Sequence, residues 1–323
     1  MNNEYAIQKR RLGKTEIEIT PIGLGVMQFA GGKGMFKMMF PDIPQEQKNL
    51  IIKTALDGGI NWFDTAELYG RGRSERSLVE ALKSLEVPDS EVIIGTKWFP
   101  MLRTARSIGQ TIDKRLFYLD GYTIDLHMVH QPMGLSSREN EMDAMADLVD
   151  AGKIRFVGVS NFGPESMRRS HAALEKRGLP LAVNQVEYSL LRRNIETNGL
   201  LDTARELGVT IVAWGPLASG ILSGKFHDPE VLAQAPTFRR RRLEPLLNRT
   251  PPLISILQEI AEKYQATAAQ VALNWLIHFH GESVVAIPGA SKVHQAQEAA
   301  AAMQFKLSSD EMERLDQVSR EIQ

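Results

Sequence analysis

Short apolar runs recur along the chain, and each ends at a glycine or at a polar or aromatic residue. Segments with helical periodicity separate these runs. Buried strands that alternate with helices indicate a parallel sheet covered on both faces, and eight such units in about 250 residues predict an α/β fold of the (β/α)₈ TIM barrel type. The eight runs end at Gly25-Val26-Met27, Phe63-Asp64, Thr96-Lys97, Val129-His130, Ser160-Asn161, Gln185-Val186-Glu187, Val212-Ala213-Trp214 and Ile287-Pro288-Gly289.

Further segments add to this barrel. Residues 8–20 predict an N-terminal hairpin with Gly13-Lys14 at its turn. Residues 217–250 follow the seventh strand, and their prolines and glycines predict a long loop without a helix, of the lid or binding type. A capping box at Ser136-x-x-Glu139 is expected to begin one barrel helix, and an extra C-terminal helix is expected to begin at Ser308. No boundary interrupts the pattern, so residues 1–323 are expected to form a single domain.

Composition narrows the classes of partner. The chain has 323 residues, and its 38 Lys+Arg balance 39 Asp+Glu, so we expect neither a nucleic acid nor an anionic membrane as a partner. The sequence has no apolar run of membrane-helix length and no signal-peptide pattern at its start, which predicts a cytoplasmic location. It contains no cysteine and no metal-ligand spacing, so disulfides, thiolate sites and a bound metal are not expected.

Polar and aromatic side chains gather at the strand ends. Each one alone has a structural explanation, such as a helix cap for Asp64, a salt bridge for Lys97 or core packing for Trp214. In a barrel, however, the carboxyl ends of all strands meet on one rim, which is where the active site lies. Together they therefore favour a functional site, whose candidates are Asp64, Tyr69, Lys97, His130, Ser160, Asn161, Gln185 and Trp214.

Four of these groups suggest proton transfer to a carbonyl. Tyrosine is a poor acid with a free pKa near 10, and a cationic Lys97 held by Asp64 is expected to lower the pKa of Tyr69. His130 is expected to donate a hydrogen bond to the same substrate oxygen. Such a set needs a hydride source, for which a nicotinamide is the natural candidate.

The motifs that carry these residues resemble those of the aldo-keto reductases over nearly the whole chain. They are Asp64-Thr65-Ala66-Glu67-Leu68-Tyr69-Gly70, Gly95-Thr96-Lys97, His130-Gln131-Pro132, Gly152-Lys153-Ile154-Arg155, Gly158-Val159-Ser160-Asn161-Phe162, Asn184-Gln185-Val186-Glu187-Tyr188 and Ile287-Pro288-Gly289-Ala290. The resemblance implies a catalytic tetrad of Asp64, Tyr69, Lys97 and His130, in which the tyrosine protonates the carbonyl oxygen as hydride leaves the nicotinamide C4.

The resemblance also implies where the cofactor binds. Ser160, Asn161 and Gln185 match residues that hold the nicotinamide carboxamide, and Trp214 matches the aromatic residue that stacks on the ring. Residues 215–225 resemble the loop over the pyrophosphate, where glycines free backbone amides for the phosphates. The expected cofactor contacts outside this group are Gly25, Val26, Met27, Asp64, Gly215, Pro216, Leu217, Ser219, Gly220, Lys225, Ile287, Gly289, Ser291, Lys292, Gln295 and Glu298.

The adenosine end departs from the family pattern, because Gln295 and Ala299 replace the arginine and asparagine that are common there. Lys292 is either a contact to the ribose 2′-phosphate or a solvated lysine at a helix start, and it favours NADP over NAD. The run Arg239 to Arg242 is either a solvated face or the source of one arginine that reaches the cofactor phosphates. The Met/Phe-rich stretch from Gly31 to Pro44 is either a wall of the substrate pocket or core filler.

Our first hypothesis is an enzyme that reduces an aldehyde or ketone to an alcohol with NADPH. Its single-domain shape and the segment Ile287-Pro288-Gly289-Ala290 resemble the bacterial and plant branch that includes pyridoxal reductases and general aldehyde reductases. The alternatives are a redox sensor that holds the cofactor with slow turnover, like the β subunits of potassium channels, and a lyase or isomerase in which Lys97 forms a Schiff base. The partner is a small carbonyl compound, and the motifs leave its identity, the favoured direction and the oligomeric state open.

Overall fold

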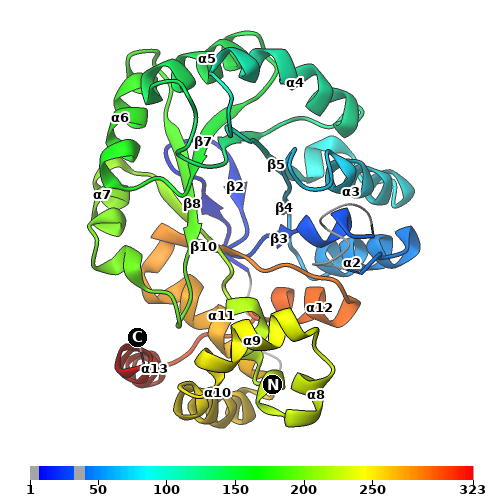
Figure 1. Ribbon diagram of the computed structural model, residues 1–323, viewed down its shortest axis with the longest axis vertical. Coiled ribbons are helices and arrows are strands. Elements are labelled where there is room, and N and C mark those ends of the chain that lie inside the picture. The colour runs from blue at the N-terminus through cyan, green and yellow to red at the C-terminus, as the bar shows by residue number, and fades with distance from the viewer. Residues whose placement is uncertain (1–6, 33–40, 323) are drawn as a thin grey trace.

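The computed structural model describes residues 7–32 and 41–322. Figure 1 shows the strands at the centre of the molecule with the helices arranged around them. Within the described residues, eight parallel strands form one sheet in the order β10-β9-β8-β7-β6-β5-β4-β3, so each strand pairs with its neighbour along the chain. The strands are β3 (Leu24–Gly25), β4 (Trp62–Asp64), β5 (Ile93–Trp98), β6 (Leu126–Val129), β7 (Phe156–Ser160), β8 (Leu181–Glu187), β9 (Thr210–Trp214) and β10 (Val284–Ile287).

The two edges of this sheet meet and close a barrel. Single parallel bridges join Ile22 to Ala286 and Gly25 to Gly289. The Gly25 N–H also donates to the Pro288 carbonyl over 3.0 Å. Every strand end named from the apolar pattern lies within two residues of the observed end, so the (β/α)₈ prediction is confirmed. These ends all lie on one rim, because neighbouring strands run parallel.

Helices cover the outside of the barrel, and most of them bury one stripe of side chains. In α4, for example, Ile108, Ile112 and Leu119 are buried at helical spacing. Across the described part of the chain, no helix combines the length and apolarity needed to cross a membrane. The helices up to β9 are α2 (Gln45–Asp57), α3 (Arg73–Ser84), α4 (Arg106–Leu119), α5 (Arg138–Asp150), α6 (Pro164–Glu175) and α7 (Leu200–Leu207). Those after β9 are α8 (Pro229–Ala233), α9 (Thr237–Leu247), α10 (Pro251–Tyr264), α11 (Ala268–Phe279), α12 (Val293–Ala301) and α13 (Ser309–Glu321).

The predicted N-terminal hairpin is present and closes one end of the barrel. Strands β1 (Arg10–Arg11) and β2 (Glu18–Ile19) pair antiparallel, and Leu12 and Ile17 pack with apolar side chains of the barrel strands. The Gly13 N–H donates to the Thr210 hydroxyl over 2.8 Å. Thr210 is the first residue of β9, so the hairpin lies at the amino-terminal end of the strands, opposite the rim where the predicted site lies.

The stretch after β9 differs from its prediction. It contains α8 and α9, so the expectation of a loop without a helix was wrong. Two of its prolines sit where a helix tolerates them, because Pro229 occupies the first turn of α8 and Pro236 the N-cap of α9, where no intrahelical N–H bond is made. Pro245 lies inside α9, only two residues before its last residue, Leu247.

Two predicted helix caps had different outcomes. The cap of α13 is confirmed, since the Ser308 hydroxyl accepts from the Glu311 N–H and the Glu311 carboxylate accepts from the Ser308 N–H. The cap of α5 is Ser137, whose hydroxyl accepts from the Asn140 N–H over 3.2 Å. The cap predicted at Ser136 was therefore wrong by one residue. Ser136 instead accepts from the Ala105 N–H over 2.9 Å and ties the loops after β5 and β6 together.

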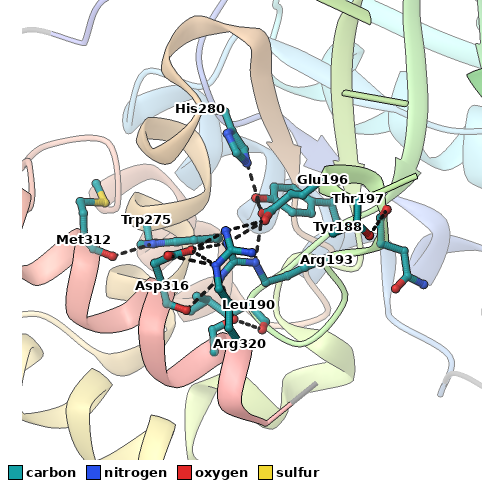
Figure 2. A network of polar contacts seen from close by, with 12 residues as sticks. Tyr188, Leu190, Arg193, Glu196, Thr197, Trp275, His280, Met312, Asp316 and Arg320 are labelled. Carbon is teal, nitrogen blue, oxygen red and sulfur yellow. Dashed lines mark hydrogen bonds and ion pairs between the residues drawn. The ribbon is translucent and has the colours of Figure 1, made fainter. Parts of the chain in front are cut away.

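The C-terminal helix α13 is held to the loop after β8 by a network of charges, which Figure 2 shows. We call Tyr188, Arg193, Glu196, His280, Asp316 and Arg320 the α13 brace. Arg193 donates to the Glu196 carboxylate over 2.8 and 3.0 Å and to the Ser319 hydroxyl over 3.1 Å. The side chains of Arg193 and Glu196 are only 4% and 6% exposed. This buried network joins residues more than 120 positions apart.

Candidate active site

The lysine and the aspartate at the ends of neighbouring strands form a buried ion pair. The Lys97 Nζ atom donates to both Asp64 carboxylate oxygens, over 2.6 and 2.7 Å, and to the Thr65 carbonyl over 2.7 Å. Lys97 is completely buried. Burial lowers the pKa of Lys97, although Asp64 and Glu75 act in the opposite direction. Since a buried ammonium needs a nearby negative charge, the direct contact with Asp64 favours the cationic form of Lys97.

Tyr69 lies beside this pair, five residues after Asp64. Its ring centroid is 5.3 Å from the Lys97 Nζ atom. Burial and the nearby Asp64 carboxylate raise the pKa of Tyr69. The expectation that this pKa would be lowered was therefore wrong, because burial, together with the Asp64 carboxylate, disfavours the charged phenolate. The phenol stays protonated at neutral pH and can act as a proton donor.

His130 completes the group from the end of β6. Its ring meets the Tyr69 ring edge-on, with 5.7 Å between centroids, and meets the Phe99 ring at the same distance. Burial and the charge of Lys97 lower the pKa of His130 to about 3. The imidazole is therefore neutral at physiological pH, with one nitrogen that carries a proton and one that accepts. The structure thus brings together all four residues of the predicted tetrad.

Gln185, Ser160 and Asn161 form a chain of hydrogen bonds next to the tetrad. The Gln185 amide donates to the Asp64 carboxylate over 2.8 Å, so Gln185 also orients the aspartate. Ser160 donates to the Gln185 carbonyl over 2.9 Å, and Asn161 donates to the Ser160 hydroxyl over 3.0 Å. Asn161 has a left-handed backbone with φ +61°. Strained residues of this kind cluster at ligand sites.

Trp214 lies at the end of β9 with its indole fixed from one side. The indole N–H donates to the Asn161 side-chain oxygen over 3.0 Å. The backbone after it is strained, since Ala218, Ser219 and Gly220 have φ values of +48°, +60° and +94°. Non-glycine residues in this conformation, here Ala218 and Ser219, cluster at active sites and ligand-binding loops. This loop is joined to Trp214 by three further residues that were expected to contact the cofactor, Gly215, Pro216 and Leu217.

Three cations gather over the strained loop. Arg239, from α9, donates to the Ser219 carbonyl over 3.0 Å and lies 4.9 Å from the Phe226 ring centroid. Burial lowers the pKa of Lys225, the positive charges of Arg239 and Lys292 lower it further, and the Glu298 carboxylate raises it. A cluster of cations with one opposing carboxylate fits a polyanion. Arg239 thus differs from Arg240, which pairs with Glu244 on the helix surface.

The end of β10 supplies most of the remaining predicted contacts. The Gln295 side-chain oxygen accepts from the backbone N–H groups of Ser291 and Lys292 over 2.8 and 3.1 Å, so it caps α12. Other predicted residues surround the closing seam of the barrel: Gly25, Val26, Met27, Ile287 and Gly289. Of the Met/Phe-rich stretch, residues 33–40 lie outside the described residues.

A second buried polar layer lies behind the tetrad and was missed from the sequence. Glu75 of α3 is fully buried and accepts from the Thr96 hydroxyl over 2.7 Å. Arg115 of α4 is also buried, 3.3 Å from the Glu75 carboxylate. The sequence spacing could have predicted the burial of Glu75, because Glu75 falls on the apolar stripe of Leu78 and Leu82. A charged residue at a core position of an amphipathic helix implies a buried partner.

Comparison with known proteins agrees with this geometry. The sequence profile of the Aldo/keto reductase family matches residues 21–320. The chain is 31% identical to the chloroplastic pyridoxal reductase of Arabidopsis thaliana, over 97% of this chain and 86% of that protein. A thermostable aldo-keto reductase crystallised with the inhibitor epalrestat superposes with a TM-score of 0.78 at 30% identity, over 97% of this chain and all of that one.

A second solved structure has a defined ligand. An aldo-keto reductase from Klebsiella pneumoniae in complex with NADPH superposes with a TM-score of 0.74 at 25% identity, over 97% of this chain and 95% of that chain. The barrel, the clustered strand-end residues and the match over residues 21–320 agree with one another, and the chain belongs to the aldo/keto reductase family of oxidoreductases.

Proposed function

We propose that this protein reduces an aldehyde or ketone to an alcohol with NADPH as the hydride donor. The observation that carries the proposal is the position of Tyr69 between two partners. Lys97, clamped by Asp64, lies 5.3 Å from the tyrosine ring centroid, and the His130 ring meets it edge-on. A proton donor, a cation and a neutral imidazole at one point suit the protonation of a carbonyl oxygen.

The residues at the strand ends fit a nicotinamide cofactor. Trp214 offers an aromatic face held by Asn161, and the strained loop at Ser219 and Gly220 lies under Lys225 and Arg239. In this arrangement Trp214 would hold the nicotinamide ring and the cations would hold the phosphates. NADPH bound there supplies a hydride to the carbonyl carbon. The NADPH complex of the Klebsiella relative supports this choice of cofactor.

The chain's own residues account for the proton. A carbonyl oxygen placed between Tyr69 and His130 accepts a hydrogen bond from each, and the Tyr69 proton moves to that oxygen as negative charge develops on it. The Lys97 ammonium then stabilises the tyrosinate that remains. Because burial keeps the His130 imidazole neutral, it orients the substrate oxygen without competing as the acid.

The loops after β4, β5 and β6, which follow the strand ends at the site, favour a substrate with an apolar portion. Exposed large apolar side chains lie on the three successive loops after β4, β5 and β6. Leu102 is 82% exposed and has a left-handed backbone with φ +55°, an unusual combination of exposure and strain. We therefore propose a carbonyl attached to an aryl or alkyl group. The exposed residues on these loops are Leu68, Met101, Leu102, Met133 and Leu135.

A panel of carbonyl compounds tests the proposal. Purified protein is mixed with NADPH or NADH and with propanal, octanal, benzaldehyde, pyridoxal or simple ketones, and the loss of nicotinamide absorbance is followed. We expect turnover with NADPH and a higher kcat/KM for octanal than for propanal. No turnover with any of the compounds would contradict the proposal. A borohydride-trapped adduct on Lys97 in place of NADPH consumption would favour a Schiff-base enzyme.

A further inference from the structure

The polar layer behind the tetrad contains a carboxylate that the mechanism does not use. Glu75 lies in the first turn of α3 and is fully buried. Its carboxylate accepts from the Thr96 hydroxyl over 2.7 Å. Thr96 and Lys97 are consecutive in β5, so their side chains point to opposite faces of the strand. Glu75 therefore lies behind the barrel wall that carries the buried lysine on its inner face.

The other groups that face Glu75 leave its charge only partly compensated. Arg115 lies 3.3 Å from one Glu75 oxygen and 3.7 Å from a Glu67 oxygen. That Glu75 oxygen and the Arg115 Nε and Nη1 atoms have no hydrogen-bond partner among the described residues. His127 of β6 also lies next to Arg115, and burial lowers its pKa to about 3, so it adds no charge. The part of the Glu75 negative charge that Arg115 does not compensate can therefore act on Lys97.

The electrostatics connect Glu75 to Lys97. Burial raises the pKa of Glu75 to about 7, against the effects of Arg115 and Thr96. Glu75 therefore becomes ionised as the pH rises through about 7. Its charge raises the pKa of Lys97, in the same direction as Asp64 does. Charges that act through protein rather than water interact strongly over several ångströms.

We propose that Glu75 is a positioning residue that keeps the buried Lys97 ammonium charged from behind strand β5. The proposal rests on the proposed function, because it assigns Lys97 a role in carbonyl reduction. Asp64 holds the ammonium directly on the inner face of the barrel, and Glu75 adds a second negative charge on the outer face. Two carboxylates on opposite sides of one strand let a fully buried lysine stay cationic where Tyr69 needs it.

The test is the pH profile of Glu75→Gln, with Glu141→Gln as the matched control. Glu141 is also fully buried, is paired with Arg138, and has a pKa raised by burial to about 7, but only Arg138 affects it. We expect the basic limb of kcat/KM to move down by about one pH unit in Glu75→Gln and to stay in place in Glu141→Gln. A limb that stays in place in Glu75→Gln, or moves equally in both variants, would overturn the proposal.

A second measurement separates this proposal from the proposed function. Lysine labelled with ¹³C at Cε reports the titration of Lys97 by NMR without turnover, and Lys97→Met identifies its signal. If the wild type reduces no carbonyl compound, the proposed function and the catalytic part of this proposal are overturned. If the Lys97 titration is unchanged in Glu75→Gln, only the electrostatic part is overturned. If Glu75→Gln does not fold, Thr96→Val removes the hydrogen bond to the carboxylate, and a smaller downward shift is expected. No shift in that variant counts against the proposal.

Discussion

Two buried charge clusters in this protein are built in opposite ways. In the α13 brace (Figure 2), burial raises the pKa of Glu196, but hydrogen bonds from His280, Arg193 and Tyr188 lower it to about 2. At the tetrad, burial lowers the pKa of Lys97 and raises that of Glu75 to about 7. The brace therefore holds the Glu196 carboxylate in its charged form, whereas burial shifts the pKa values of Lys97 and Glu75 toward their neutral forms.

The number of partners for each charge explains the difference. Glu196 accepts from Tyr188 over 2.6 Å, from Arg193 over 2.8 and 3.0 Å and from Arg320 over 3.2 Å. Behind the tetrad, by contrast, one Glu75 carboxylate oxygen and the Arg115 Nε and Nη1 atoms have no hydrogen-bond partner among the described residues. Saturated buried charges stabilise one geometry, and under-compensated ones are typical of sites that move protons.

The largest expected effect lies at the tetrad. Tyr69→Phe removes the proton donor and leaves the packing intact, so we expect kcat for aldehyde reduction to fall by about 10²–10⁴-fold or more. Cofactor affinity, followed by nucleotide fluorescence, should stay near the wild-type value. Tyr264→Phe, which loses a hydroxyl bonded to Glu311 outside the site, is the control and should keep its activity. A Tyr69→Phe variant with most of its turnover would show that the acid is another group.

The brace should show the reverse pattern. Arg193→Met removes the buried one of the two arginines that Glu196 and Asp316 share and leaves only the more exposed Arg320, and breaking a buried pair costs about 3–5 kcal/mol of unfolding free energy. The activity of each folded molecule should change little. Arg314→Met is the control, because its pair with Glu259 is exposed to solvent and contributes little to stability. Urea denaturation measures the free energy of unfolding, and initial rates measure the activity. Equal losses of unfolding free energy in the two variants would mean that the brace stabilises the protein no more than an exposed ion pair does.

The sequence predicted one of these clusters and not the other, for a physical reason. Asp64, Lys97 and His130 stand at the ends of apolar runs, so the barrel topology places them on one rim without any knowledge of side-chain packing. Arg193 and Asp316 lie in a loop and on a helix, 123 residues apart. No periodic pattern relates such positions, and only the docking of α13 brings them together. Glu75 is intermediate, since its helical spacing predicts burial but not its partner.

Acid pH should weaken the brace. The folded pKa of Glu196, about 2, lies below its ordinary value of 4.5. Its contribution to stability is therefore complete above about pH 4.5 and is lost as the pH falls toward 2. We expect Glu196→Gln to be less stable than the wild type by roughly 2 kcal/mol at neutral pH, with the gap closing in acid. Urea denaturation between about pH 6 and 3 measures the gap. A constant gap would show that Glu196 stabilises through packing and not through its charge.

The smallest expected effect concerns the three cations over the loop after β9, Lys225, Arg239 and Lys292. It tests whether their positive charge binds the cofactor. Lys292→Ala should weaken NADPH by about tenfold and NADH hardly at all, because only NADPH has a 2′-phosphate, and one charge-assisted contact contributes on the order of 1.5 kcal/mol. Fluorescence titration with each nucleotide measures this ratio.

Lys225→Ala is the matched comparison for Lys292→Ala. Lys225 lies against Gly220 in the strained loop, with its Nζ atom 3.6 Å from the position a Gly220 Cβ would take. A contact to the pyrophosphate is shared by both nucleotides, so this variant should weaken NADPH and NADH equally. If Lys292→Ala also weakens both equally, the cluster binds phosphate without distinguishing the two cofactors. If neither variant weakens the binding of either nucleotide, the positive charges of Lys225 and Lys292 have no role in cofactor binding. The contrast with the brace then holds only for the tetrad region.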